Sequence, residues 1–280
     1  GSERLKEFQR NISFYPLWNK TPYFDFLRQI LNLNQSLPVN RRINLYLCGR
    51  EFTWDKIQTY EEWRQAINKH RDSIIAENIS NNFEKIKKTQ RNKMLVILNE
   101  AHAITNENWK DNWQKRVGQY LTEKYSNNKL FSILINSIKV NDDGDNCLLQ
   151  KGLWDAAFKI TKKNNIGFNF TGSPFGNASF DYAKGINNKK FQYKDIFDGF
   201  IYFQPIEKHR LSRGIEDIIS NDFRSEFLRR VRIYSKENYN KLKNDTILSG
   251  LNTREYYEYQ NINAMLERID KLINFYSKKK

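Results

Sequence analysis

The sequence lacks the residue patterns that usually indicate a metal centre, a disulfide framework or a nucleotide-binding site. Its two cysteines, Cys48 and Cys147, stand far apart and outside any paired metal-ligand or redox motif. It contains no phosphate-binding glycine loop, no Gly-x-Ser-x-Gly motif and no His-Glu-x-x-His motif. We therefore expect neither a cofactor nor a bound metal ion, and the scarcity of cysteine favours a reducing compartment.

Long apolar runs are also missing. No segment approaches the roughly 20 residues that a helix needs to cross a bilayer, and no basic-then-apolar leader precedes a small-residue cleavage site. We therefore expect a soluble protein without a transmembrane segment, acting in a cytoplasmic environment. The opening Gly1-Ser2, without a methionine, is typical of a cloning remnant, so we expect the natural N-terminus to lie upstream.

The chain does contain enough apolar material to fold. Of its 280 residues, 39% are hydrophobic and 14% are aromatic, which is far more than a disordered chain carries. The formal net charge of +15 would attract nucleic acid, an anionic membrane or an acidic protein. However, the basic residues are scattered along the whole length among many asparagines, a pattern that codon bias in an AT-rich genome also explains. We therefore do not expect nucleic acid as the partner.

Apolar periodicity predicts alternating helices and strands in the first half of the chain. Thr21 and Pro22 have the character of a helix start. The expected elements are a helix at residues 14–34, a strand at 43–48, one or two helices at 61–88, a strand at 94–98, a helix at 109–125 and a strand at 130–138. Residues 94–98 are continuously apolar and are predicted to be buried on both faces. The alternation predicts an α/β fold with a largely parallel central sheet flanked by helices.

The last third of the chain is predicted to be mainly helical. A short strand is expected at residues 200–203, followed by charged helices at 215–234 and 256–276. We interpret residues 1–205 as an α/β domain and residues 206–280 as a C-terminal helical extension. The extension would either cap the sheet domain or form an arm for interaction.

His102 is the strongest candidate for chemistry among the three histidines. It closes Asn99-Glu100-Ala101-His102, directly after the expected strand at 94–98, and open α/β sheets bind ligands beyond the carboxyl ends of their strands. If the extended backbone continues to His102, the side chains of Glu100 and His102 project to the same face. The carboxylate would then orient the imidazole as a general base or acid. The alternative is that His102 only hydrogen-bonds a helix end.

Three further charged residues are candidates for the same site. Arg50 and Glu51 follow the expected strand at 43–48, which places them at a neighbouring strand end. Their alternative role is a surface ion pair. Arg71 lies in an expected helix, and an arginine that reaches the sheet end would stabilise developing negative charge.

The other two histidines are weaker candidates. His70, Arg71 and Asp72 are adjacent in an expected helix, where neighbouring residues point in different directions, so they are not expected to form a joint site. His209 follows the last expected strand and is a minor candidate for lining a pocket.

Several short motifs, in their order and spacing, resemble the erythromycin esterase superfamily. The similar segments are residues 19–27, 42–49, 71–79, 99–102, 118–121 and 197–203. Among them, Arg71-Asp72 begins a helix like the family's Arg-Asp-x-x-Met-Ala-x-Asn helix, and His102 matches a family histidine after a buried strand. The superfamily also includes haem-binding ChaN-like proteins, Tiki-like proteases and domains of bacterial toxins and type III secreted effectors. The resemblance implies an esterase-like hydrolase of the effector or toxin type, secreted by bacteria into a host cell.

The sequence also departs from the family pattern. Family esterases carry His-Asn-x-His after the buried strand, whereas Asn99 and Glu100 occupy the first two of these positions here. The family's Gly-Glu-x-x-His motif does not occur in residues 1–18. The expectation is therefore a hydrolase with a divergent active site that acts on a small molecule or a host protein. The alternative is a catalytically inactive module that binds a host protein through its basic surface and C-terminal helices.

Overall fold

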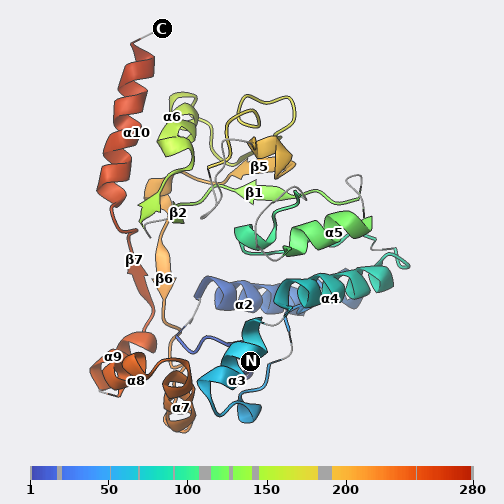
Figure 1. The fold of residues 1–280 in the computed structure, drawn as a ribbon, viewed down its shortest axis with the longest axis vertical. Helices are drawn as coiled ribbons and strands as arrows, with labels where there is room; N and C mark the ends of the chain where they lie inside the picture. The colour runs from blue at the N-terminus through green and yellow to red at the C-terminus, as the bar shows by residue number, and fades with distance from the viewer. Residues whose placement is uncertain are drawn as a thin grey trace. The chain divides into compact units, whose positions relative to one another are not determined.

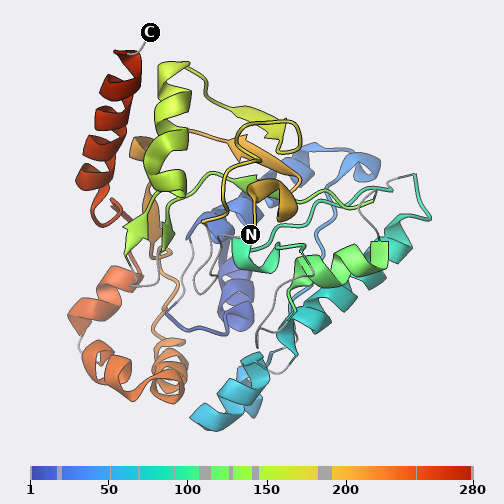
Figure 2. The ribbon, with the colours of Figure 1, turned by 45° about the horizontal axis from the view of Figure 1, so that its top comes forward.

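The computed structural model describes the protein as two compact units of mixed helix and strand (Figure 1 and Figure 2). The residues described are 2–17, 21–50, 52–68, 70–90, 92–106, 115–125, 129–140, 145–181, 191–243 and 245–278. Unit 1 combines residues 1–71 with 211–257, and unit 2 combines residues 72–210 with 258–280. The chain therefore passes between the units three times, whereas the sequence favoured a single boundary near residue 205.

Unit 1 is built mainly from helices. These are α1 (Ser2–Ile12), α2 (Thr21–Ser36), α3 (Tyr60–Asn68), α7 (Arg224–Tyr234), α8 (Lys236–Leu242) and α9 (Asp245–Leu251). Its two strands, β6 (Leu211–Arg213) and β7 (Glu255–Tyr257), pair antiparallel and lie side by side in Figure 1. Helix α2 begins at Thr21, whose hydroxyl donates a 2.5 Å hydrogen bond to the Gly214 carbonyl. This bond joins the two sequence segments of the unit.

Unit 2 contains a small mixed sheet and the remaining helices. The sheet has the strand order β1 (Ile133–Ile135), β5 (Gly199–Tyr202) and β4 (Ile166–Asn169). Strands β1 and β5 are parallel, whereas β4 and β5 are antiparallel. A separate ribbon pairs β2 (Lys139–Val140) with β3 (Asn146–Cys147). The helices are α4 (Arg71–Ile86), which enters the unit at its second residue, α5 (Val117–Tyr125), α6 (Leu153–Ile160) and α10 (Ile262–Ser277).

An aromatic cluster packs α6 onto one face of this sheet. The Trp154 and Phe158 rings of α6 contact the Phe200 and Tyr202 rings of β5, and Phe158 stacks on Tyr202 with 4.2 Å between ring centroids. All four side chains are buried, and each large apolar side chain that is fully buried contributes about 1.5–3 kcal/mol to folding. The cluster therefore contributes several kcal/mol to the stability of unit 2.

The C-terminal helix packs on the same α6 helix. Figure 1 shows α10 running beside α6, and Met265 and Ile269 of α10 are buried in a cluster with Ala156 of α6. The last predicted helix is therefore confirmed, although it starts at Ile262, after strand β7. Among the described helices, none combines the length and the apolarity that a membrane crossing requires.

Most of the other predicted helices are present with shifted ends. The helix predicted at 14–34 is α2, and the region at 61–88 divides into α3 and α4. The break between them contains His70, whose backbone has a left-handed φ of 52°, so this histidine does not lie in a helix as predicted. The prediction at 109–125 is confirmed by α5 for its second half, and residues 107–114 lie outside the described part of the chain.

The strands predicted at 43–48 and 94–98 are not strands in the structure. Residues 94–98 are also not buried on both faces as predicted, because Leu95 is 85% exposed and Ile97 is 67% exposed. Met94, Val96 and Leu98 alternate with them and are half-buried, so only one side of this segment packs against protein. A continuous apolar run is compatible with either arrangement, because burial depends on neighbouring elements that the run does not specify.

Asp155 is a carboxyl group buried inside unit 2. It lies on α6, is 6% exposed and accepts a 3.4 Å hydrogen bond from the Tyr202 hydroxyl. Burial raises the pKa of Asp155 to about 6, against the lowering effects of the Tyr202 hydroxyl and the Lys159 ammonium. Because the folded protein holds this proton more tightly than the unfolded chain does, ionisation of Asp155 destabilises the fold.

We predict that Asp155→Asn stabilises the protein at pH 7 by about 1–3 kcal/mol, since one pKa unit corresponds to about 1.4 kcal/mol. The asparagine keeps an oxygen that accepts from Tyr202 and has no charge to bury. The gain should be small at pH 4, should disappear below about pH 3, where the wild-type carboxyl is protonated in both states, and should grow as the pH rises toward 6. Urea unfolding at pH 4 and pH 7 measures this difference, and an equal effect at both pH values would contradict it.

Candidate functional site

The structure pairs His102 with a buried aspartate in unit 2. The His102 Nδ1 atom lies 2.8 Å from the Asp72 Oδ2 atom, with the two side chains 20% and 10% exposed. An ionised carboxylate only accepts hydrogen bonds, so the imidazole donates its Nδ1 proton to Asp72. The bond fixes both the orientation and the tautomer of the ring.

Helix α4 positions Asp72 in its first turn, on the helix face that is buried. Ile75 and Ile79 follow at helical spacing and are buried on the same face as Asp72. The N-terminal end of a helix also carries a partial positive charge that favours a carboxylate. The apolar face therefore anchors the helix, and the helix end stabilises the charge that His102 requires.

A short turn and two side-chain hydrogen bonds hold the loop that carries His102. Glu100–His102 forms a 3-10 turn, η3, and the Asn99 side chain caps it by accepting from the Ala101 N–H. Directly after the turn, the Ser132 hydroxyl donates a 3.0 Å hydrogen bond to the Ala103 carbonyl. Thr105 then donates through its hydroxyl to the Ile196 carbonyl at 2.8 Å. The loop is thus tied, directly after His102, to Ser132 before β1 and to Ile196 three residues before β5.

Glu100 does not have the geometry expected from the sequence. The predicted Glu100–His102 pairing assumed an extended backbone, but the chain turns at Asn99 into η3. In a 3-10 turn, residues two apart are not on the same side, and Glu100 is exposed. Asp72 therefore takes the position next to the imidazole that the sequence assigned to Glu100.

The predicted arginines belong to unit 1 and have partners of their own there. Arg50 Nη1 donates to the Gln65 carbonyl at 3.3 Å. The Arg71 guanidinium lies 4.9 Å from the centroid of the Phe14 ring. Glu51 lies outside the described residues, so its predicted role stays a prediction.

His209 lies after β5 and is half-buried in unit 2. Its Nε2 atom is 3.1 Å from the Gln204 carbonyl oxygen. Burial lowers the pKa of the imidazole, opposed by the bond to Gln204. The contact with the Gln204 carbonyl explains the position of the imidazole ring without a ligand.

The Asp72–His102 pair is suited to proton transfer. With Nδ1 donating to the carboxylate, the lone pair of the ring is on Nε2, which can take a proton from water or a hydroxyl group. The carboxylate then stabilises the imidazolium that forms. Among the described residues there is no group of three or more His, Cys, Asp or Glu side chains arranged to hold a metal ion.

Sequence reasoning identified His102 but missed Asp72. The two residues lie 30 positions apart, and spacing along the chain does not reveal such a partner. One signal was present, because Asp72 occupies the same apolar stripe as Ile75 and Ile79. A charged residue on the buried face of a helix needs a polar partner, and this pattern marks it for attention.

Helix α5 approaches the His102 loop so closely that only glycine fits at the contact. A Cβ atom added to Gly118 would collide with the Ile104 carbonyl oxygen and would lie 2.6 Å from the Ala103 carbonyl oxygen. Both oxygens belong to the backbone directly after His102. The loop can therefore occupy this position only because residue 118 has no side chain.

We predict that Gly118→Ala destabilises the protein by about 1–3 kcal/mol, the usual cost of overpacking. Helix propensity alone would give the opposite sign, a gain of about 0.5–1 kcal/mol. Gly250→Ala is the matched control, because Gly250 also lies in a helix, α9, and its added Cβ would meet no atom within 4 Å. Chemical denaturation measures both variants, and NMR of the imidazole reports whether His102 moves. Equal stabilisation by the two substitutions would contradict the close contact.

Comparison with known proteins identifies no relative of this chain. It matches no protein-family model, no curated protein and no solved structure. The Asp72–His102 geometry therefore carries the functional argument.

Proposed function

We propose that the protein is a hydrolase in which the Asp72–His102 pair activates a water molecule. The observation that carries this proposal is the 2.8 Å contact between His102 Nδ1 and the buried Asp72 carboxylate. A histidine that only fills space does not need a buried anion beside it, and burying such an anion is costly. The partly exposed imidazole adds access for a reactant.

The reaction would proceed in two proton transfers. His102 Nε2 takes a proton from water while the water oxygen bonds to the carbonyl carbon of an ester or lactone. The imidazolium, stabilised by Asp72, then returns this proton to the alkoxide as the carbon–oxygen bond of the ester breaks. The products are a carboxylic acid and an alcohol, and the imidazole is again neutral.

The erythromycin esterase-like resemblance supports the same reaction class. The resemblance implies a largely parallel central sheet. The parallel pairing of β1 with β5 supports this part of the proposal. The resemblance also implies an effector or toxin that bacteria secrete into a host cell, acting on a small molecule or host protein. The proposal gives no role to Arg50 and Arg71, which contact the Gln65 carbonyl and the Phe14 ring within unit 1.

The test is turnover of a panel of esters, lactones and amides by the wild type and three variants. We expect His102→Ala and Asp72→Asn to lose about 10²–10⁴-fold in activity, the usual contribution of a general base. Glu100→Gln is the matched control, because it removes a carboxylate two residues from His102 that is exposed in the structure. It should retain activity within about threefold, since exposed charges contribute little. Circular dichroism confirms that each variant is folded.

Two outcomes would contradict this assignment. Full activity of folded His102→Ala would exclude the imidazole as the base, and an equal loss in Glu100→Gln would restore the pairing expected from the sequence.

If the wild type hydrolyses none of the panel, the second candidate function becomes the better-supported one. That function is an interaction module for an acidic host protein, favoured by the exposed Phe275 and Tyr276 of α10 and by Lys278, which follows the helix.

A further inference from the structure

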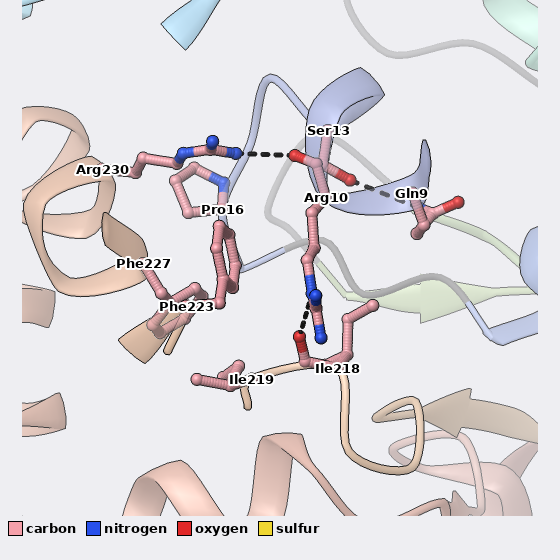
Figure 3. Close-up of a pocket in the computed structure, with 9 residues that line it drawn as sticks. All are labelled: Gln9, Arg10, Ser13, Pro16, Ile218, Ile219, Phe223, Phe227 and Arg230. Carbon is pink, nitrogen blue, oxygen red and sulfur yellow. Dashed lines mark hydrogen bonds between the residues drawn. The ribbon is translucent and has the colours of Figure 1, made fainter. Parts of the chain in front are cut away.

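A small cavity in unit 1 has no room for a substrate or a partner group. Its volume is about 20 Å³, and a single water molecule already needs roughly 10–15 Å³. Figure 3 shows Arg10 and Arg230 at its wall, where their guanidinium groups donate to the Ile218 and Arg10 carbonyls. By contrast, the sheet of unit 2 leaves an apolar face exposed.

The strand register assigns the residues of this sheet to two faces that differ in exposure. Leu134 and Phe200 are register partners on the face that α6 covers, and both are buried. Ile135 and Ile201 are partners on the opposite face, which Ile133 shares because side chains alternate along a strand. There Ile133 is 42% exposed, Ile135 is 55% exposed and Ile201 is half-buried. The sheet is thus covered by α6 on one side and exposes apolar side chains on the other.

Two phenylalanines and a glycine complete the exposed face. Phe131 and Phe203 continue the alternation beyond the ends of β1 and β5, and both are exposed. Gly167 of β4 is the partner of Ile201, and a Cβ atom added to it would meet the Ile201 Cγ1 atom at 3.5 Å, an ordinary contact distance. A glycine with such space inside a strand often marks the close approach of another backbone. We call the surface formed by Phe131, Ile133, Ile135, Gly167, Ile201 and Phe203 the open face.

The open face has the dimensions of one short helix. Its three strands are spaced about 4.8 Å apart, so the outer two lie about 10 Å apart, close to the roughly 10–12 Å diameter of a helix with its side chains. Strands of three or four residues extend about 10–13 Å, which is about two turns of helix. A sheet with parallel strands is normally covered by helices on both faces. We therefore expect the open face to fit the apolar stripe of one amphipathic helix.

Lysines at the ends of the sheet indicate the charge of this helix. Lys129 precedes β1, and Lys162 and Lys163 precede β4. All three are exposed, and within the described part of the chain no carboxylate lies within ion-pair distance of them. The Asp198 carboxylate, before β5, accepts a 2.7 Å hydrogen bond from the Ser132 N–H and is thus already engaged. The ends of the open face therefore favour carboxylates on the partner.

The same charge argues against a second copy of this chain as the occupant. The formal net charge of +15 makes two copies repel each other. In a symmetric contact the three lysines would also lie close to those of the other copy. Glu207, after β5, does not compensate them, because it pairs with Lys159 at 2.9 Å. An acidic partner is therefore the better fit.

We propose that the open face binds an amphipathic helix of an acidic partner protein. The apolar stripe of the helix covers Ile133, Ile135 and Ile201, and its backbone passes over Gly167. Its carboxylates lie near the lysines at the sheet ends. The open face contains no residue of the proposed hydrolase site, so this binding site is independent of the hydrolase proposal.

Two synthetic helical peptides test the site on the full chain. Both carry the same leucine stripe over about three turns, with glutamate at the other positions of one peptide and lysine in the other. We expect the glutamate peptide to bind about tenfold more tightly in isothermal titration calorimetry, because a few exposed ion pairs together contribute about this factor. In methyl NMR of the wild type, the glutamate peptide should shift the Ile133, Ile135 and Ile201 signals and leave those of the buried Ile75 and Ile79 unchanged.

Three variants locate the binding site. Ile135→Ser should weaken binding of the glutamate peptide about tenfold, the usual scale for a residue at the centre of an interface. Gly167→Val should also weaken it, although it adds apolar surface, because the new side chain occupies the space of the helix backbone. Val39→Ser is the matched control and should leave the affinity unchanged, because Val39 is an exposed apolar residue of unit 1. Circular dichroism confirms that each variant is folded.

Several outcomes would overturn the proposal. Equal affinity for the two peptides, binding of neither, or tighter binding by Gly167→Val would each contradict a helix with acidic flanks that packs closely on the sheet. A dimer in sedimentation that Ile135→Ser dissociates would make a second copy the occupant. Binding to phosphatidylserine vesicles that Ile135→Ser abolishes, without binding to the glutamate peptide, would make the open face a membrane contact.

Discussion

The packing of α6 aromatic side chains against β5 is the interaction on which unit 2 depends. Phe200, in contact with Trp154, sets the position of β5, and β5 holds β1 beside it in parallel register. Ser132, directly before β1, in turn fixes the Ala103 carbonyl next to His102. The imidazole therefore has its place because a sheet several contacts away is held by close-packed rings, which do not change their arrangement gradually.

Two buried carboxylates among the described residues of unit 2 differ in their environments. Asp72 has an imidazole at 2.8 Å and lies in the first turn of a helix, where the backbone favours negative charge. Asp155 accepts a hydrogen bond from a hydroxyl at 3.4 Å, and burial raises its pKa to about 6. A carboxylate with a titratable nitrogen beside it can take part in proton transfer, whereas one buried with a neutral hydroxyl mainly affects stability. This contrast separates the functional candidate from a structural acid group.

The sequence predicted local features better than it predicted partners. The helix start predicted at Thr21 agrees with the first residue of α2, where the Thr21 hydroxyl donates to the Gly214 carbonyl. The choice of His102 followed from its position after an apolar run and stays a prediction. The Glu100 pairing failed because a single Asn99 side chain caps a turn that breaks the alternation of an extended backbone. The prediction that residues 94–98 form a strand buried on both faces was wrong, and Leu95 is exposed. Such burial requires neighbouring strands, and the apolar run itself does not encode which distant segments pair with it.

The interleaving of the two units along the chain constrains how the protein folds. Thr21 bonds to Gly214, and the Arg230 guanidinium donates to the Arg10 carbonyl, so unit 1 joins segments separated by 193 and 220 positions. Contacts at such separation close long loops and slow folding. During synthesis, the N-terminal helices emerge from the ribosome well before the segment that covers them. Their apolar faces stay uncovered until residues 211–257 have been synthesised, so α1 and α2 are exposed to aggregation during that interval.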